Sequence, residues 1–129
     1  MIKKLSVALV AMSIVAIAQP AVGQSRAESD AAHRAEIAKQ VAISEAIGKV
    51  RLVQSAGQIE RMQTVTAQRL LVDKALEAVR VAGPSEATAA RAALLTAQAN
   101  QRSAIAAVDA KVKTAVDAAQ AVVDSLMRN

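Results

Sequence analysis

Side chains that could act as nucleophiles, general bases or soft-metal ligands are scarce in this sequence. It contains no cysteine and one histidine, His33, which falls near the start of a predicted helix. A catalytic serine or threonine needs a nearby base, and zinc sites are built largely from thiolates and imidazoles. We therefore expect no catalytic residue and no metal site, and we expect His33 to be an exposed helix residue.

Carboxylates alone could still bind a hard cation, and three aspartates recur in the last quarter of the chain. Asp109, Asp117 and Asp124 are eight and seven residues apart, but each has a basic residue four positions away. Opposite charges at that spacing form surface ion pairs along a helix. The four glycines are dispersed, so there is no glycine-rich loop that could bind a phosphate. These features predict a protein that is not an enzyme and that binds no cofactor.

The composition limits which elements could position any functional group. The chain has 129 residues, of which 53% are hydrophobic, and no Phe, Tyr or Trp. Sheet-containing cores normally rest on aromatic and β-branched side chains, whereas this core must be built mainly from Ala, Val, Leu and Ile. No Gly or Pro occurs in residues 58–82 or 85–129, which is typical of long helices. The sequence predicts a single all-α domain.

The charge balance gives no sign of a nucleic-acid partner. The formal net charge is +5, which includes Lys3 and Lys4, and basic and acidic residues alternate along the chain without a long basic run. Such interspersed charges are typical of a solvated helical surface. Without aromatic residues there is also no platform on which bases could stack. We expect no binding of nucleic acid.

The first 23 residues have the pattern of a secretory signal peptide. Two lysines precede an apolar run from Leu5 to Ala18, and Ala21 and Gly23 supply the small side chains that a leader peptidase accepts. This pattern predicts cleavage between Gly23 and Gln24, with Ala16 and Ala18 offering a second possible site. The alternative is an uncleaved anchor, but a run of about 14 apolar residues is shorter than the roughly 20 that span a bilayer. The mature protein is expected in the periplasm or outside the cell, without membrane contact.

The remaining segment, residues 24–129, is predicted to form two helices joined by one turn. Ser25 and Glu28 have the spacing of a capping box, which places the first helix at about residues 26–82. Glycine suits the left-handed conformation after a helix end, and proline cannot continue a helix. The turn is therefore expected at Gly83, Pro84 and Ser85, followed by a second helix over about residues 86–127. The prediction is a long antiparallel, coiled-coil-like hairpin.

Apolar residues spaced alternately three and four apart predict where these helices pack. Such a heptad pattern requires a helical partner. In the first helix the predicted seam consists of Met62, Val65, Val72, Leu76 and Val79, with Arg69 as a polar intruder. In the second helix it consists of Ile105, Val108, Val112, Ala115, Ala119, Val122 and Leu126. Upstream of Ile105 the seam meets Gln101 and Gln98, so weaker packing is expected toward the turn.

Two glycines interrupt the first helix. Gly48 and Gly57 each cost about 1 kcal/mol relative to alanine in a helix interior. The alternatives are that glycine is merely tolerated there, that another helix approaches closely, or that these positions form a hinge. The pattern alone does not choose between these alternatives.

Two classes of function fit these features. The first is a structural or assembly protein of the bacterial cell envelope, which would pack with itself or with a larger envelope or secretion apparatus. The second is a periplasmic chaperone or adaptor that binds unfolded or amphipathic clients, although the chain lacks the Met and aromatic richness of such surfaces. An amphipathic helix on a membrane surface is a weaker alternative, because Trp and Phe anchors are missing. In the first class, apolar residues such as Val116, Val123, Leu70 and Leu71 widen the seams and predict a bundle completed by a homo-oligomer or by a partner.

Overall fold

A computed structural model describes residues 23–129 of the chain. These residues form two helices, α1 (Gly23–Val81) and α2 (Ala87–Arg128), and no strand occurs among them. The all-α class is therefore confirmed. The predicted signal peptide lies outside the described residues except for Gly23, which is the first residue of α1.

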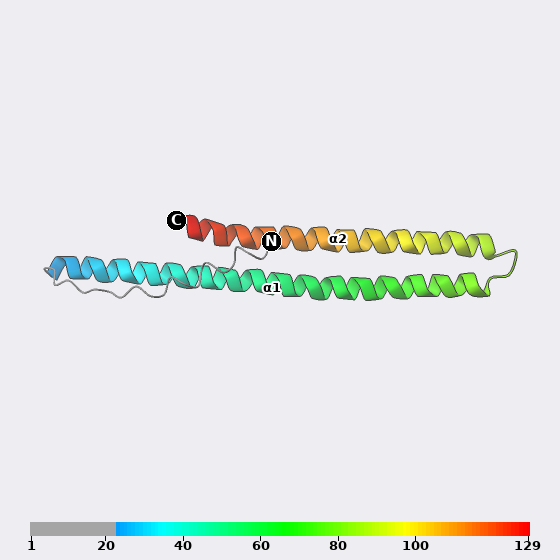
Figure 1. Cartoon of the computed structure of the whole chain (residues 1–129), viewed down its shortest axis with the longest axis horizontal. Coiled ribbons are helices and arrows are strands. Elements are labelled where there is room, and N and C mark those ends of the chain that lie inside the picture. The colour runs from blue at the N-terminus through cyan, green and yellow to red at the C-terminus, as the bar shows by residue number, and fades with distance from the viewer. Residues whose placement is uncertain (1–22) are drawn as a thin grey trace, which may run out of the picture. The chain divides into compact units, whose positions relative to one another are not determined.

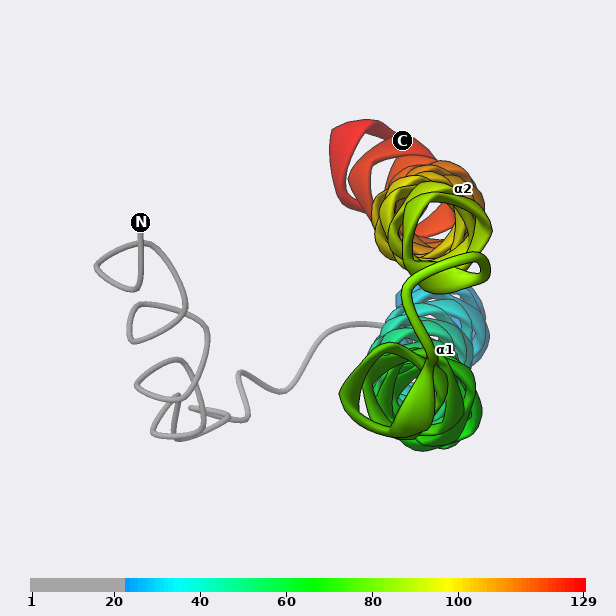
Figure 2. The ribbon, with the colours of Figure 1, turned by 90° about the vertical axis from the view of Figure 1, so that its right-hand side faces the viewer.

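Residues Ile37–Asn129 form one compact unit, and within it the two helices run antiparallel along each other. Figure 1 shows α2 returning beside α1 from the turn, and Figure 2, which looks along the helices from the turn, shows α2 covering one side of α1. The hairpin prediction is confirmed for this unit. Residues 23–36 of α1 belong to a separate unit, in which the side chains of residues 25–36 are exposed.

The start of α1 differs in detail from the predicted capping box. The helix begins at Gly23, so Ser25 is its third residue and does not occupy the position that precedes a helix. Glu28 consequently lies beyond the first turn, which contains no acidic residue. A change of a few residues at a helix end leaves the packing of the rest of the helix unaltered.

The turn lies where the sequence predicts it, but it is built differently. Gly83 does not have a positive φ, so it is not the left-handed cap that was expected. Its carbonyl oxygen instead accepts hydrogen bonds from the backbone N–H groups of Glu86 and Ala87, both at 3.0 Å. Glu86 precedes α2 without a side-chain cap, and Ser85 lies within the turn. The reversal therefore depends on backbone hydrogen bonds, while Pro84 prevents α1 from continuing.

The most buried side chains of the hairpin lie at the end far from the turn. Ala46 and Val50 of α1 pack there with Val123 of α2, and their exposed fractions are 6%, 8% and 3%. Ile47, Ala119 and Leu126 surround this cluster. Elsewhere along the described hairpin the facing residues other than Gly57, which is buried, are only half-buried, because two helices cover only one side of each other.

Candidate interaction surface

The two helices of the hairpin approach each other closely at Gly57. A Cβ atom placed on Gly57 would lie 2.5 Å from Cγ1 and 2.9 Å from Cγ2 of Val112. These separations are far below a van der Waals contact, so only glycine leaves room for the valine at this point. Gly57 had been expected to be tolerated, to allow another helix to approach closely, or to form a hinge; the structure shows the close approach of another helix. At Gly48 no atom lies within 4 Å of such a Cβ, and α1 continues through both glycines.

Two ion pairs between the helices lie just beyond this contact. The Nε of Arg61 donates to Oδ1 of Asp109 at 2.7 Å, and the Nζ of Lys111 donates to Oε1 of Glu60 at 2.7 Å. Each pair joins one residue of α1 to one of α2, so both fix the same antiparallel alignment as the Gly57 contact. Because both pairs are largely exposed, each contributes at most about 1 kcal/mol.

Some of the predicted ion pairs within α2 have other partners. Asp109 pairs with Arg61 across the hairpin instead of with Lys113. Lys113 pairs with Asp117, as its spacing of four residues suggests. The carboxylate of Asp124 accepts a hydrogen bond from Gln120, and Arg128 donates to the Asp124 backbone carbonyl.

The structure brings most of the predicted seam residues to the face between the helices, which we call the inner face. The half-buried ones are Val65, Val72, Val79, Ile105, Val108, Val112, Ala119 and Leu126. Four predicted residues lie elsewhere: Met62 is 70% exposed, Leu76 is 46% exposed, Val122 is 53% exposed, and Ala115 is also exposed. On α2 the neighbours Val116 and Val123 take the inner positions instead. Both had been expected only to widen the seam.

This shift follows from the spacing of the inner residues. From Ile105 through Val108 and Val112 to Val116, the half-buried positions advance by three, four and four residues, which is eleven residues in total. A strict alternation of three and four falls about 20° behind in every seven residues of a straight helix, and one added step of four offsets this drift because four residues make more than a full turn. The inner face therefore passes from Val112 to Val116 and not to Ala115.

A buried polar group marks the half of the inner face that lies nearer the turn. The side-chain oxygen Oε1 of Gln68 is buried and has no hydrogen-bond partner. Gln68 lies eleven residues after Gly57, and Gln101 lies eleven residues before Val112. Because Gly57 and Val112 are in contact and the helices are antiparallel, these two half-buried glutamines lie at the same level of the hairpin. The polar seam expected around Gln101 is thus joined by a glutamine of α1. Arg69, which was predicted to interrupt the seam of the first helix, is exposed.

A second apolar surface runs along the side of α1 that faces away from α2. Ile59 follows Gly57 by two residues, which is about 200° around a helix, and the other members have similar angular positions. We call this surface the outer stripe; its residues are Ile37, Val41, Gly48, Leu52, Ile59, Met62 and Leu70. The exposed fractions of its large side chains range from 48% at Ile37 to 70% at Leu52 and Met62. Ile37, Gly48, Ile59 and Leu70 are spaced eleven residues apart, the period of three turns of a nearly straight helix.

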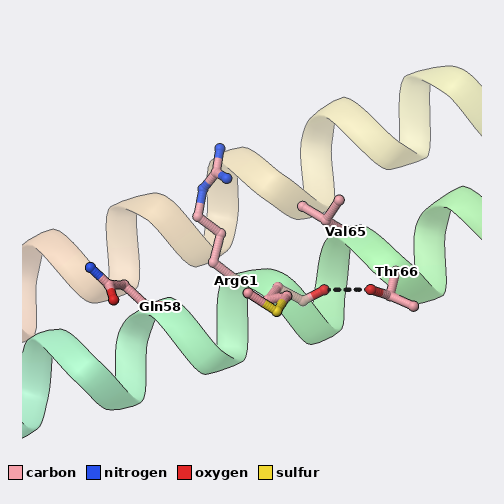
Figure 3. Close-up of a pocket in the computed structure, with 5 residues that line it drawn as sticks. Gln58, Arg61, Val65 and Thr66 are labelled. Atoms are coloured by element: carbon pink, nitrogen blue, oxygen red, sulfur yellow. Dashed lines mark hydrogen bonds between the residues drawn. The ribbon is translucent and has the colours of Figure 1, made fainter.

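The surface of α1 is shallowly hollowed around Met62, which belongs to the outer stripe. Gln58, Arg61, Val65 and Thr66 line one hollow with Met62, and Figure 3 shows these side chains along α1. The hydroxyl of Thr66 donates to the backbone carbonyl of Met62 at 2.9 Å. Ile59, Gln63 and Ala67 line the adjoining hollow. Both hollows are open and mainly apolar, so they suit side chains of a packing partner better than a polar substrate.

The residues considered for chemistry lie apart from one another. His33 is exposed on α1, and among residues 23–129 no three His, Cys, Asp or Glu side chains gather as a metal site would require. No helix of this part of the chain is long and apolar enough to cross a bilayer. The candidate functional surface is therefore the outer stripe, which sequence reasoning had not identified, although it had noted that Leu70 widens the seam. The eleven-residue spacing was the signal that could have revealed it.

Searches against protein-family models, curated proteins and solved structures found no match to this chain.

Proposed function

We propose that this chain is an exported, non-enzymatic structural or assembly protein of the bacterial cell envelope, which acts by packing its helices against itself or against a larger envelope or secretion apparatus. One observation carries the proposal: large apolar side chains along the outer stripe are 48% to 70% exposed, while among residues 23–129 the only hydrophobic side chains that are buried belong to Ala46, Val50 and Val123. Contiguous exposed apolar surface of this kind marks a site of protein interaction.

The energetics favour a helical partner for the outer stripe. Fully burying a Val, Leu, Ile or Met side chain stabilises a protein by about 1.5 to 3 kcal/mol. Leu52, Ile59 and Met62 gain little of this in the isolated hairpin, because more than half of each side chain remains exposed. A straight apolar stripe is the surface that a second long helix covers efficiently.

The proposed export rests on the sequence pattern of residues 1–23, with its lysines, apolar run and small residues before Gln24. Export would place the hairpin in a compartment where many small proteins are stapled by disulfides. This chain contains no cysteine. Packing with partners would supply stabilisation that a disulfide cannot provide here.

Crosslinking in living cells, followed by purification of a tagged chain from the envelope fraction, tests the proposal. We expect the chain to be recovered with further copies of itself or with a small, reproducible set of envelope proteins. Leu52→Asp should abolish recovery of these partners, whereas Ala106→Asp, on the exposed surface of α2, should leave it unchanged. Recovery of a broad mixture of unrelated unfolded proteins would indicate the chaperone alternative. A chain found only in the cytoplasm would contradict the proposal.

A further inference from the structure

We propose that the outer stripe of α1 binds the outer stripe of a second copy of this chain, in an antiparallel pair related by a two-fold axis. The inference deepens the proposed function, because it names the partner and the surface through which the chain assembles. It concerns only the compact unit of residues 37–129.

The open space beside Gly48 is the first observation that supports this pairing. The hairpin itself does not require glycine there, because no atom lies within 4 Å of an added Cβ. The other glycine inside the paired part of α1, Gly57, receives Val112 from an antiparallel helix. Gly48 lies nine residues before Gly57, and therefore about 180° around the helix, on the outer stripe. A glycine on an apolar stripe offers the same kind of space to an antiparallel helix on the other side of α1.

The arrangement of the stripe identifies the occupant as a second copy. The two-fold register that places Ile59 of one copy opposite Gly48 of the other also places Leu52 opposite Ser55 and Val41 opposite Thr66. At Gly48 and at Ser55 a large side chain meets a much smaller residue, which is how packed helices interdigitate, while Val41 and Thr66 have nearly the same size. The register finally places Ile37 opposite Leu70 at the two ends of the stripe. A single surface that complements itself in this way is the hallmark of a two-fold interface.

The length of the stripe is sufficient for a specific dimer. From Ile37 to Leu70 it extends over 33 residues, or roughly 50 Å at 1.5 Å per residue. A helix-wide contact of that length buries on the order of 1,000 Å² from the two copies together, which is the minimum expected of a specific interface. The hollows beside Met62 adjoin the stripe and offer space for side chains of the second copy.

Variants that exchange the sizes of the side chains at positions 48 and 59 test the proposed pairing. In the full chain, produced with its leader and purified after export, Gly48→Leu should raise the dimer dissociation constant at least about tenfold, because the new side chain meets Ile59 of the other copy. Ile59→Ala should weaken the dimer as well. The double variant should return the dissociation constant to within about threefold of the unaltered chain. Leu95→Ala removes an equally exposed apolar side chain from α2, where it lies 66% exposed, and should change nothing.

Distances between nitroxide labels test the direction of the pair. A single cysteine introduced at exposed Ala56 carries a label close to the two-fold axis, and one at exposed Ala38 carries a label near the end of the stripe. In the antiparallel dimer the two labels at position 56 should lie within about 25 Å, and those at position 38 roughly 45 Å apart. Short distances at both positions would overturn the antiparallel register.

The outcomes separate this inference from the function on which it rests. A chain that remains dimeric while Gly48→Leu changes nothing would overturn the interface and leave assembly through other surfaces intact. A chain that is monomeric at all concentrations, but is crosslinked to another envelope protein in cells, would overturn self-pairing alone. A monomer that recruits no envelope protein would overturn both.

Discussion

Val112 of α2 occupies the space above Gly57 of α1, where a Cβ atom would lie 2.5 Å from its Cγ1. This contact joins residues 55 positions apart in the chain and sets the distance between the two helices. The flanking pair of Arg61 and Asp109 aligns the helices in the same register. Together these contacts define which face of α1 is left for a partner.

Gly57→Ala should destabilise the hairpin even though alanine is the better helix former. Alanine gains about 1 kcal/mol in helix propensity, but forcing a methyl group against Val112 costs about 1 to 3 kcal/mol. Urea unfolding followed by circular dichroism measures the balance. Val112→Ala alone should also destabilise the protein, and the double variant should be more stable than the sum of the two changes predicts.

Gly83→Ala provides the matched control. Gly83 has no positive φ, and no atom lies within 4 Å of an added Cβ, so alanine fits the turn as it stands. Restricting the unfolded chain should then stabilise the protein by about 0.4 to 1 kcal/mol. A loss of stability at this position would show that the turn requires the left-handed conformation expected from the sequence.

Gln68→Met should stabilise the protein by about 1 kcal/mol or more. The buried Oε1 of Gln68 has no hydrogen-bond partner, and an unpaired buried acceptor costs about 1 to 3 kcal/mol. Methionine has a similar volume and no polar oxygen. Thermal unfolding compares this variant with Gln54→Met, which alters an exposed glutamine of the same helix and should have little effect. An unchanged or lower stability for Gln68→Met would mean that the amide is satisfied.

Reversing the charges of one ion pair tests the register of the hairpin. Arg61→Asp and Asp109→Arg should each lower the free energy of unfolding by up to about 1 kcal/mol, since each places like charges together. Combining them should restore most of the loss, and the restoration should diminish in high salt because the pair is exposed. Additive losses in the double variant would contradict the observed alignment.

The position of the turn and the type of both elements could be predicted from the sequence, because Gly83 and Pro84 interrupt a chain that otherwise favours helix. The precise inner face could not. Ala115 and Val116 are both apolar, as are Val122 and Val123, so the pattern of α2 alone does not distinguish one stripe from its neighbour. Which of the two neighbours faces α1 depends on the path of the inner face along a nearly straight helix. After the step of four from Val108 to Val112, that path takes a second step of four and reaches Val116.

The interhelical contacts were beyond sequence reasoning for a different reason. Asp109 has an opposite charge four residues away in Lys113, and only the alignment of the two helices brings Arg61 closer. Gly57 is equally ambiguous in the sequence, since a hinge and a close approach both favour glycine. Such choices are decided by residues about 50 positions away in the chain.

The mature protein should begin at Gln24. The small residues Ala21 and Gly23 satisfy the requirement of a leader peptidase. Intact-mass measurement of chain exported by a bacterial host determines the first residue. A species in the envelope that retains Met1 to Gly23 would contradict cleavage and would favour an anchored protein.

The most direct test of the account is the association state of the purified mature chain. Sedimentation equilibrium should show a dimer or larger species at micromolar concentration, and the unfolding temperature should rise with protein concentration, because association stabilises only the folded chain. The expectation follows from a hairpin in which three hydrophobic side chains of the described residues are buried while the large side chains of the outer stripe stay exposed. A folded monomer at micromolar concentration, melting cooperatively at a temperature that is independent of concentration, would contradict the claim that pairing with a partner completes the fold.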